Sequence, residues 1–402
     1  MKTDCLDTLN RWCWLLLAIA IVAGLAHSCG PVSAATRLVP EEYLTIQSAI
    51  DSAAAGDTVL LSPGTYRGPG NRGIEFRGRD LVLKSRNGPE ETIIDCERAD
   101  RGFYLHELES RAARIEGLTI QHGYASSESD FGSGGGIFCG LSDPTIVGCR
   151  VLECQAAGDG GGVALFVSSA AVDGCEISAC LANRGGGIWV SLGEAEIKDC
   201  VITGNGGGQG GGVCFGGSGS DRLLGCTVAA NWVGTDGGGI LALEPLLLER
   251  CVVWGNCSWM GADEIRCGHA AIRCCDIDTT GVVSRGTITY DENCLYSDPM
   301  FCLAAPCGWH TEGDWSLDAT SACLPEHSPC GELIGALGQG CSGAPSTGAC
   351  CVANDSCVVE SQQACVQGSG VYMGDAVPCE VNTCVPTPTR VTSWGRIKAA
   401  YR

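Results

Sequence analysis

A short polar segment carries the residue types that acid–base chemistry needs. The segment Tyr124–Ser133 contains Glu128 and Asp130, and His122 lies just before it. Glycoside hydrolysis needs two carboxyl groups about 5–9.5 Å apart, and a lyase needs a base, often beside calcium held by several acids. One hypothesis is therefore catalysis by His122, Glu128 and Asp130. The alternative is an ordinary solvated loop.

A second set of residues has the types that bind sugars or a protein partner. Phe138, Ala164, Trp189, Cys214 and Leu241 recur at a fixed position of the repeat described below. That position is predicted to point outward, as is Trp254. Exposed aromatic rings stack on sugar rings or pack on a partner, so Phe138, Trp189 and Trp254 are the predicted binding residues. The alternative is that a loop or the C-terminal segment covers them.

The elements that position these residues come from an internal repeat of about 25 residues. Its most regular column holds six cysteines: Cys149, Cys175, Cys200, Cys226, Cys251 and Cys275. An aliphatic residue stands three positions before each and another two positions after it. Asn205, Asn231 and Asn256 stand five positions after the third, fourth and fifth cysteines, and a Gly-Gly-Gly corner opens each unit. Such regular spacing is typical of a solenoid.

The repeat predicts a parallel β-helix, with right-handed coils. Short stretches of alternating, β-branched residues favour strands, and three such strands per unit cannot bury a face unless the coils stack. Stacked cysteines keep the strand spacing of about 4.8 Å, whereas disulfide Cβ atoms lie about 3.8 Å apart. We therefore expect a ladder of free buried thiols, with a redox or metal-binding column as the alternative. The asparagines are predicted to form a hydrogen-bonded ladder at a turn.

Outward charges in neighbouring coils alternate in sign. Asp159 is expected beside Arg184, Asp173 beside Lys198, and Glu249 beside Arg273. Opposite charges on adjacent strands stabilise a sheet, whereas a metal or paired-carboxylate site needs acids to gather. The regular repeats therefore predict no metal site and no cofactor, and calcium remains an alternative only in the loops.

The repeat also resembles known families. The pattern Gly-Gly-Gly-[Val/Ile] followed by Cys-x-[Val/Ile]-x-x-Asn is similar to polymorphic outer-membrane-protein-like and pectin-lyase-like right-handed β-helix repeats. The segment Leu44–Tyr66 resembles the start of such proteins, with a capping helix in 41–56 that Thr45 begins and Gly56 ends. Ser297–Phe301, Trp315–Leu317, Ser328–Cys330 and Ile334–Gly338 resemble a closing coil. The resemblance implies a β-helix over 57–297, a cap over 298–341, and a fold that often hosts polysaccharide lyases and hydrolases.

The two ends of the chain carry other signals. Residues 1–34 read as a signal peptide, with lipoprotein processing at Cys29 as the alternative. Six cysteines within 350–384 predict a disulfide module of unknown connectivity: Cys350, Cys351, Cys357, Cys365, Cys379 and Cys384. Cys257, Cys267, Cys302, Cys307, Cys323 and Cys330 are further disulfide candidates. Residues 385–402 form a Pro/Thr linker and a basic tail, either frayed or an anchoring tag.

Composition narrows the class of function. A net charge of −21 with 25 Lys and Arg argues against nucleic-acid binding, and no stretch beyond the signal segment is long enough to cross a bilayer. We therefore expect a secreted or surface-associated bacterial β-helix protein, monomeric, that binds or supports polysaccharide or another cell-envelope component. A polysaccharide lyase or glycoside hydrolase is the alternative.

Overall fold

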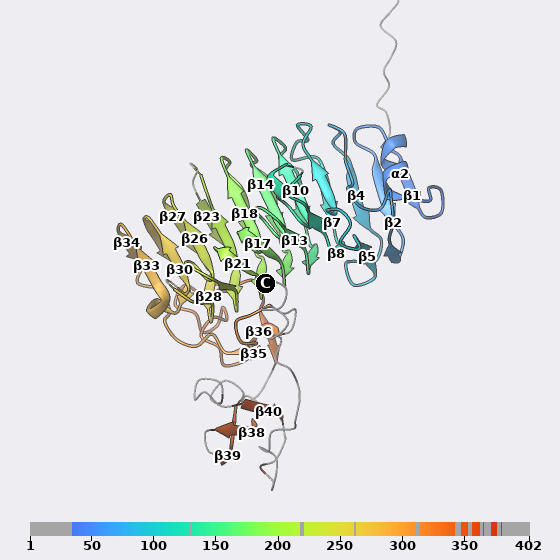
Figure 1. Ribbon diagram of the computed structural model, residues 1–402. Coiled ribbons are helices and arrows are strands. Elements are labelled where there is room, and N and C mark those ends of the chain that lie inside the picture. Colours follow the sequence, from blue (N-terminus) through green and yellow to red (C-terminus); the bar gives the residue numbers. More distant parts are fainter. Residues whose placement is uncertain are drawn as a thin grey trace, which may run out of the picture.

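The computed structural model shows a solenoid whose coils stack from the blue end at α2 to the orange end at β34 (Figure 1). The structure describes residues 34–128, 130–217, 221–260, 263–309, 313–341, 347–352, 356–361, 365, 371–375 and 379. The predicted signal peptide, apart from its last residue, and the predicted linker and tail at 385–402 lie outside these residues. No helix among them is long and apolar enough to cross a membrane.

Each coil contributes one strand to each of several parallel sheets that run along the solenoid. Sheet A contains β1 (Thr36–Val39), β2 (Thr58–Leu61), β4 (Val82–Ser85), β7 (Arg114–Glu116), β11 (Thr145–Val147), β15 (Ala171–Asp173), β19 (Glu196–Lys198), β23 (Asp221–Leu224), β27 (Leu246–Glu249), β31 (Ala270–Arg273) and β34 (Ile288–Tyr290). Sheet B contains β3 (Gly64–Tyr66), β5 (Thr92–Asp95), β8 (Thr119–Gln121), β12 (Arg150–Leu152), β16 (Glu176–Ser178), β20 (Val201–Thr203), β24 (Thr227–Ala229), β28 (Val252–Trp254) and β32 (Asp276–Ile277).

Two further sheets complete the coils. Sheet C contains β6 (Phe103–Leu105), β10 (Ile137–Gly140), β14 (Val163–Phe166), β18 (Ile188–Ser191), β22 (Val213–Phe215), β26 (Ile240–Ala242), β30 (Ile265–Cys267) and β33 (Val282–Ser284). Sheet D contains β9 (Tyr124–Ala125), β13 (Gln155–Ala156), β17 (Leu181–Arg184), β21 (Gly206–Gln209), β25 (Trp232–Val233) and β29 (Cys257–Ser258). A regular coil thus has four strands where the sequence predicts three, because the chain between the asparagine turn and the glycine corner is also extended.

The glycine corner lets the coils approach closely. Gly185 has a φ of 61°, a left-handed conformation that a side chain disfavours. A Cβ atom on Gly186 would lie 2.4 Å from the carbonyl oxygen of Gly206 in the next coil. The corner therefore excludes larger residues for two separate reasons, one conformational and one steric.

The cysteine and asparagine columns lie inside the solenoid. The six cysteines of the column are free and buried, and each Sγ that precedes Cys275 donates a hydrogen bond to a backbone carbonyl of the preceding coil, as Cys226 does to Ile197. Asn205 and Asn231 donate from Nδ2 to Ile177 and Ile202, and each also accepts the backbone N–H of the column residue before it. These bonds satisfy backbone groups that the turn removes from the sheets.

A capped helix covers the N-terminal end. Helix α2 (Ile46–Ser52) has Thr45 as its N-cap, and Ile46, Ala49 and Ile50 are buried. Strand β1 precedes the helix and pairs with β2. The solenoid therefore begins before the helix, whereas the sequence pattern predicts its start at residue 57.

The segment 298–341 does more than close the last coil. It forms sheet E from β35 (Phe301–Leu303), β36 (Asp314–Asp318) and β37 (Gln339–Cys341), and packs against the outer face of sheet B (Figure 1). Trp315 packs with Val201, Ala229 and Ala230, and the N–H of Ala336 donates to Thr227. We call this segment the lateral cap.

Disulfides fasten the lateral cap to the solenoid. Cys257 pairs with Cys307 and Cys274 with Cys330, while Cys302–Cys341 closes the cap on itself. The predicted disulfides of Cys267 and Cys323 are wrong, since both are free thiols. Cys323 belongs to the lateral cap and is buried, and its Sγ donates to Asp276 of the solenoid.

The cysteine-rich segment forms a small antiparallel sheet F from β38 (Thr347–Val352), β39 (Ser356–Ser361) and β40 (Val371–Asp375). Two disulfides join Cys350 to Cys365 and Cys357 to Cys379, and Cys351 is also disulfide-bonded. Cys384 lies outside the described residues.

Candidate functional site

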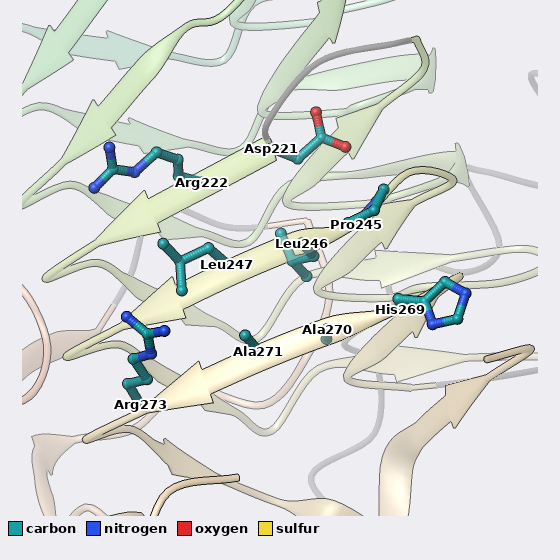
Figure 2. A pocket seen from close by; sticks show the side chains of 9 residues that line it. All are labelled: Asp221, Arg222, Pro245, Leu246, Leu247, His269, Ala270, Ala271 and Arg273. Carbon is teal, nitrogen blue, oxygen red and sulfur yellow. The ribbon is translucent and has the colours of Figure 1, made fainter. Parts of the chain in front are cut away.

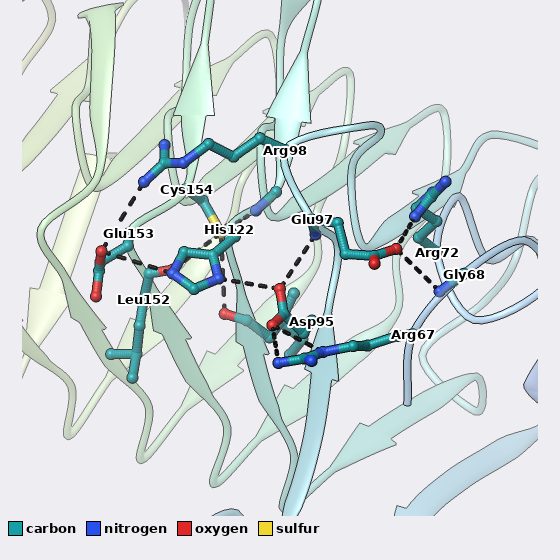
Figure 3. A network of polar contacts seen from close by, with 12 residues as sticks. Arg67, Gly68, Arg72, Asp95, Glu97, Arg98, His122, Leu152, Glu153 and Cys154 are labelled. Carbon is teal, nitrogen blue, oxygen red and sulfur yellow. Dashed lines mark hydrogen bonds and ion pairs between the residues drawn. The ribbon is translucent and has the colours of Figure 1, made fainter. Parts of the chain in front are cut away.

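His122 lies in a network of charged side chains at the turn that follows sheet B (Figure 3). It comes directly after β8, and Glu153 occupies the equivalent place after β12 in the next coil. Both residues have left-handed φ values, 54° and 51°. The turn geometry therefore presents the two side chains next to each other on the outside of the solenoid.

Asp95, at the end of β5, completes a row of three. Its Oδ1 lies 2.9 Å from Nδ1 of His122, and Nε2 of His122 lies 3.6 Å from Oε2 of Glu153. Arg67 donates to Oδ2 of Asp95 from Nη2 at 2.9 Å. Burial alone raises the pKa of Asp95, but the hydrogen bonds from His122 and from the N–H of Glu97 outweigh it and hold the pKa below its usual value.

This row can orient an imidazole. Asp95 fixes the ring through Nδ1, so Nε2 is the nitrogen left to exchange a proton near Glu153. The side chain of His122 is 31% exposed, so a solute can reach it. The arrangement allows acid–base chemistry, and it also serves as an ion-pair network between three coils.

Of the residues predicted to act with His122, Glu128 does not meet it in the described structure. Glu128 is exposed, and no described hydrogen bond or ion pair joins it to His122. Asp130 begins the short 3₁₀ helix η1 (Asp130–Gly132), and its side chain lies outside the described part of the chain. Sequence reasoning missed Asp95 and Glu153. The column four residues after each cysteine position would have placed His122 beside Glu153.

The predicted charge pairing holds at one position of three. Arg184 and Asp159 form a bidentate pair, with N–O distances of 2.8 and 2.5 Å. Asp173 and Lys198 are register partners, but Lys198 pairs with Asp199 at 3.2 Å. Glu249 and Arg273 are also register partners, and the described structure gives them no ion pair.

A cluster of possible metal ligands lies near the N-terminal coils. Glu75, His106 and Glu107 each offer a ligand atom, and these atoms lie within 4.8 Å of one another. It is the one such group of three among the described residues. Glu107 is exposed, and a solvated cluster of this kind needs no ion.

The aromatic column is buried, contrary to its predicted exposure. Phe138 is 6% exposed and Trp189 is 7% exposed, because they pack with their neighbours in the column, Ala164, Cys214 and Leu241, and with Tyr104 and Phe166. Trp254 is half-buried against the lateral cap. The open ring faces on which the binding prediction depends are therefore absent from these three residues.

A hollow of about 620 Å³ lies on the outer face of sheet A (Figure 2). Arg222 and Arg273 stand on either side of Leu247, and His269 lies at the other end (Figure 2). The floor is apolar and the guanidinium groups are exposed. Neither arginine forms an ion pair with a carboxylate among the described residues, so both can bind a ligand.

A buried carboxyl group borders the same hollow. Asp221 is 5% exposed, and its Oδ2 atom has no hydrogen-bond partner. Burial, with a smaller effect of the Glu244 charge, raises the pKa of Asp221 to about 7. The side chain points inward at the start of β23, where other coils place Ala195, Leu246 and Ala270.

One comparison with known proteins, a family model, agrees with the architecture. The family model described as "Right handed beta helix region" matches residues 135–286. No curated protein sequence matches the chain. The structure of pectate lyase Pel9A is 11% identical, with 73% of this chain and 91% of that chain covered and a TM-score of 0.38. The pectin methylesterase from Aspergillus niger is 15% identical, with 67% and 87% covered and a TM-score of 0.28.

At these sequence identities and TM-scores, neither solved structure carries an argument about this chain. The family match and the parallel register of the coils instead confirm the fold class that the repeat predicts. The chain is a right-handed parallel β-helix protein.

Proposed function

We propose that the protein is an exported, surface-associated module that binds acidic polysaccharide. The observation that carries this proposal is the hollow on sheet A, where two guanidinium groups without ion-pair partners flank an apolar floor. Guanidinium groups bind carboxylates through paired N–H donors. Apolar surface with a few placed polar groups is the usual composition of a ligand site.

The charge of the whole chain makes this pair of arginines informative. With a net charge of −21, most of the surface repels a polyanion. Arg222 and Arg273 lie 51 residues apart in the sequence, and the register of β23, β27 and β31 brings them to one hollow. A sugar acid chain would find attraction here and repulsion along much of the solenoid.

Export is supported by the chemistry of the cysteines. Disulfides persist in oxidising compartments and are rare in a reducing cytosol. The lateral cap and sheet F both depend on disulfides, and the N-terminal segment has the composition of a signal peptide.

The test is affinity electrophoresis or calorimetry of the purified chain with polygalacturonate, and with dextran as the neutral polymer. We expect binding to polygalacturonate that the double change Arg222→Ala/Arg273→Ala weakens at least tenfold. Arg77→Ala, an exposed arginine of an early coil that pairs with Asp51, is the matched control. Equal binding by the double variant and the wild-type protein would overturn the proposal.

A polysaccharide lyase or glycoside hydrolase is the second candidate function. It is favoured by His122, which Asp95 orients and which remains accessible. Incubation with acidic and neutral polysaccharides should then release unsaturated or reducing ends, and His122→Ala or Asp130→Ala should abolish the release. Product release that is unchanged in both variants excludes these residues as the catalysts.

A further inference from the structure

The outward column of sheet C is apolar in the earlier coils and contains a charged residue near the C-terminal coils. From Phe138 to Leu241 the column is apolar, and the next two register partners are Arg266 and Val283. Arg266 thus takes a place where five preceding coils bury an apolar side chain. A charged residue at the end of an apolar column needs a partner for its guanidinium group.

Arg266 lines a pocket of about 300 Å³, which is separate from the hollow on sheet A. Three arginines line it: Arg184, Arg266 and Arg285. They come from coils far apart in sequence, and Asp236 is the one carboxylate of the lining. The remaining lining is mostly apolar or small, including Leu241 and Cys214.

Arg184 is held rigidly at the edge of this pocket. Asp159 binds its guanidinium through both carboxylate oxygens, at 2.8 and 2.5 Å. The guanidinium carbon lies 5.6 Å from the centre of the Trp189 ring, and that ring stacks on Phe166 at 6.1 Å. The buried aromatic column thus positions an arginine, and such preorganisation lowers the cost of binding a ligand.

A second buried donor lies at the pocket wall. The indole Nε1 of Trp189 is buried and has no hydrogen-bond partner. A Cβ atom placed on Gly216, which lines the pocket, would lie 3.1 Å from this nitrogen. A side chain at position 216 would therefore crowd the indole N–H.

The other two arginines are less firmly paired than Arg184. Arg266 lies 3.8 Å from Asp236, longer than a hydrogen bond. Arg285 forms no ion pair with any carboxylate in the described ranges. Among the described residues, Arg184 pairs with Asp159 and Arg266 with Asp236, so Arg285 is the lining arginine without an ion pair, in a chain with a net charge of −21.

We infer that this pocket binds a small anion, a carboxylate or a tetrahedral oxyanion, independently of the polymer site on sheet A. Converging guanidinium groups are the donors that proteins use for carboxylate, sulfate and phosphate, because their N–H groups match two oxygens at once. The volume limits the ligand to one acidic sugar unit or one inorganic anion.

The test is calorimetric titration of the full chain with galacturonate, sulfate and phosphate at constant ionic strength, with galactose as the neutral probe. We expect saturable binding of at least one anion and none of galactose. The double change Arg266→Ala/Arg285→Ala should weaken that binding at least tenfold. Arg285→Lys, which keeps the charge but loses the paired donors, should weaken it less than Arg285→Ala. Preference for galacturonate identifies a sugar acid, and preference for sulfate or phosphate identifies an inorganic or ester oxyanion.

The hollow on sheet A supplies the matched control. Arg222→Ala/Arg273→Ala should leave the titration with small anions unchanged, while Arg266→Ala/Arg285→Ala should leave polygalacturonate binding unchanged. The inference is overturned if no anion binds saturably, or if both double variants weaken anion binding equally. Because the two readouts respond to different arginines, failure of one proposal is distinguishable from failure of the other.

Discussion

At the scale of single residues, the asparagine ladder makes buried hydrogen bonds that a hydrophobic side chain cannot form. Asn231 accepts the N–H of Asn205, and its Nδ2 donates to Ile202 and to Asn256. Asn256 in turn donates to Glu264, whose carboxylate ends the ladder. Each buried turn thus depends on an amide that both donates and accepts.

Asn231→Ala should therefore destabilise the protein by roughly 2–4 kcal/mol, because it leaves several buried polar groups without partners. Urea denaturation followed by circular dichroism measures the loss. Asn183→Ala is the control, since its side chain makes a single exposed bond to Ala157, and it should cost less than about 1 kcal/mol. A similar loss in both variants would contradict the role assigned to the ladder.

Asp221 should make stability depend on pH. Its carboxyl ionises near pH 4 when unfolded, whereas burial raises its pKa to about 7 in the folded protein. The contribution of the protonated carboxyl to the free energy of unfolding is therefore fully present below pH 4, and it falls as the pH rises to about 7. Asp221→Asn should raise the melting temperature at pH 8, by the equivalent of a few kcal/mol at most, and change it little at pH 4.

The control for this pH effect lies in the same sheet. Asp173 is partly exposed, so Asp173→Asn should leave the difference between pH 4 and pH 8 as it is in the wild-type protein. A pH profile that Asp221→Asn does not flatten would show that the carboxyl of Asp221 is not the group that titrates.

At the scale of elements, the lateral cap hides the outer face of sheet B over the C-terminal coils. Its contacts with the solenoid are apolar around Trp315 and Leu317, and hydrogen bonds reach as far as Ala179, which accepts from Nε1 of Trp309 at 2.5 Å. The face stays open over the earlier coils, where the His122 network lies. The cap therefore limits any ligand on sheet B to the N-terminal half of the solenoid.

Mild reduction should loosen the cap before the solenoid unfolds. Cys257–Cys307 and Cys274–Cys330 are its covalent links to the coils, and loss of a disulfide typically costs about 2–5 kcal/mol. With dithiothreitol we expect faster proteolysis within 298–341 and increased binding of an apolar dye. The mass of the protected fragment should still cover the earlier coils; its simultaneous digestion would argue against a separable cap.

The coils could be predicted well from the sequence because their signals repeat, whereas the burial of the aromatic column could not be predicted. Six cysteines in phase fix the register, so strand positions followed from spacing. The packing of the lateral cap has no repeating signal in the sequence, because Trp315 contacts Val201 and Ala229 across more than eighty residues of chain. Its coverage of Trp254, and the mutual packing of Phe138 and Trp189, depend on tertiary contacts that no local pattern records.

The candidate sites also depend on tertiary contacts that the sequence pattern does not reveal. His122 was recognisable as a chemical group, but Asp95 reaches it from a coil outside the regular repeat. Arg184 was paired correctly with Asp159 because both lie in a regular column. Arg285 follows the last strand of sheet C, so only the folded chain brings it to the pocket.

At the scale of the whole molecule, the solenoid should tolerate the loss of one complete coil. Removing Cys149–Gly174 joins Gly148 to Cys175 and restores each ladder, because the two cysteines are equivalent. We expect a folded protein with cooperative unfolding and a smaller urea m-value, since less surface is exposed on unfolding.

Two other deletions are the controls for this experiment. Removing Cys149–Gly161, about half a coil, shifts the register and should abolish folding. Removing Cys226–Arg250 keeps the register but deletes Thr227 and Ala229, on which the cap is seated. That protein should be less stable than the one lacking Cys149–Gly174, and the reverse order would contradict the proposed packing.

The distribution of cysteines along the axis sets an order for the maturation of the chain. Every described disulfide uses residues from Cys257 onward, whereas the free thiols from Cys96 to Cys251 are all buried. Solenoids grow by adding units to a folded end, and chains fold from the N-terminus during synthesis. The free thiols from Cys96 to Cys251 are thus enclosed before the disulfide cysteines emerge, whereas the free thiols Cys267, Cys275, Cys294 and Cys323 follow Cys257 in the chain. Timing of synthesis then separates the earlier thiols from the disulfide cysteines, while the later free thiols must be protected by the packing around them.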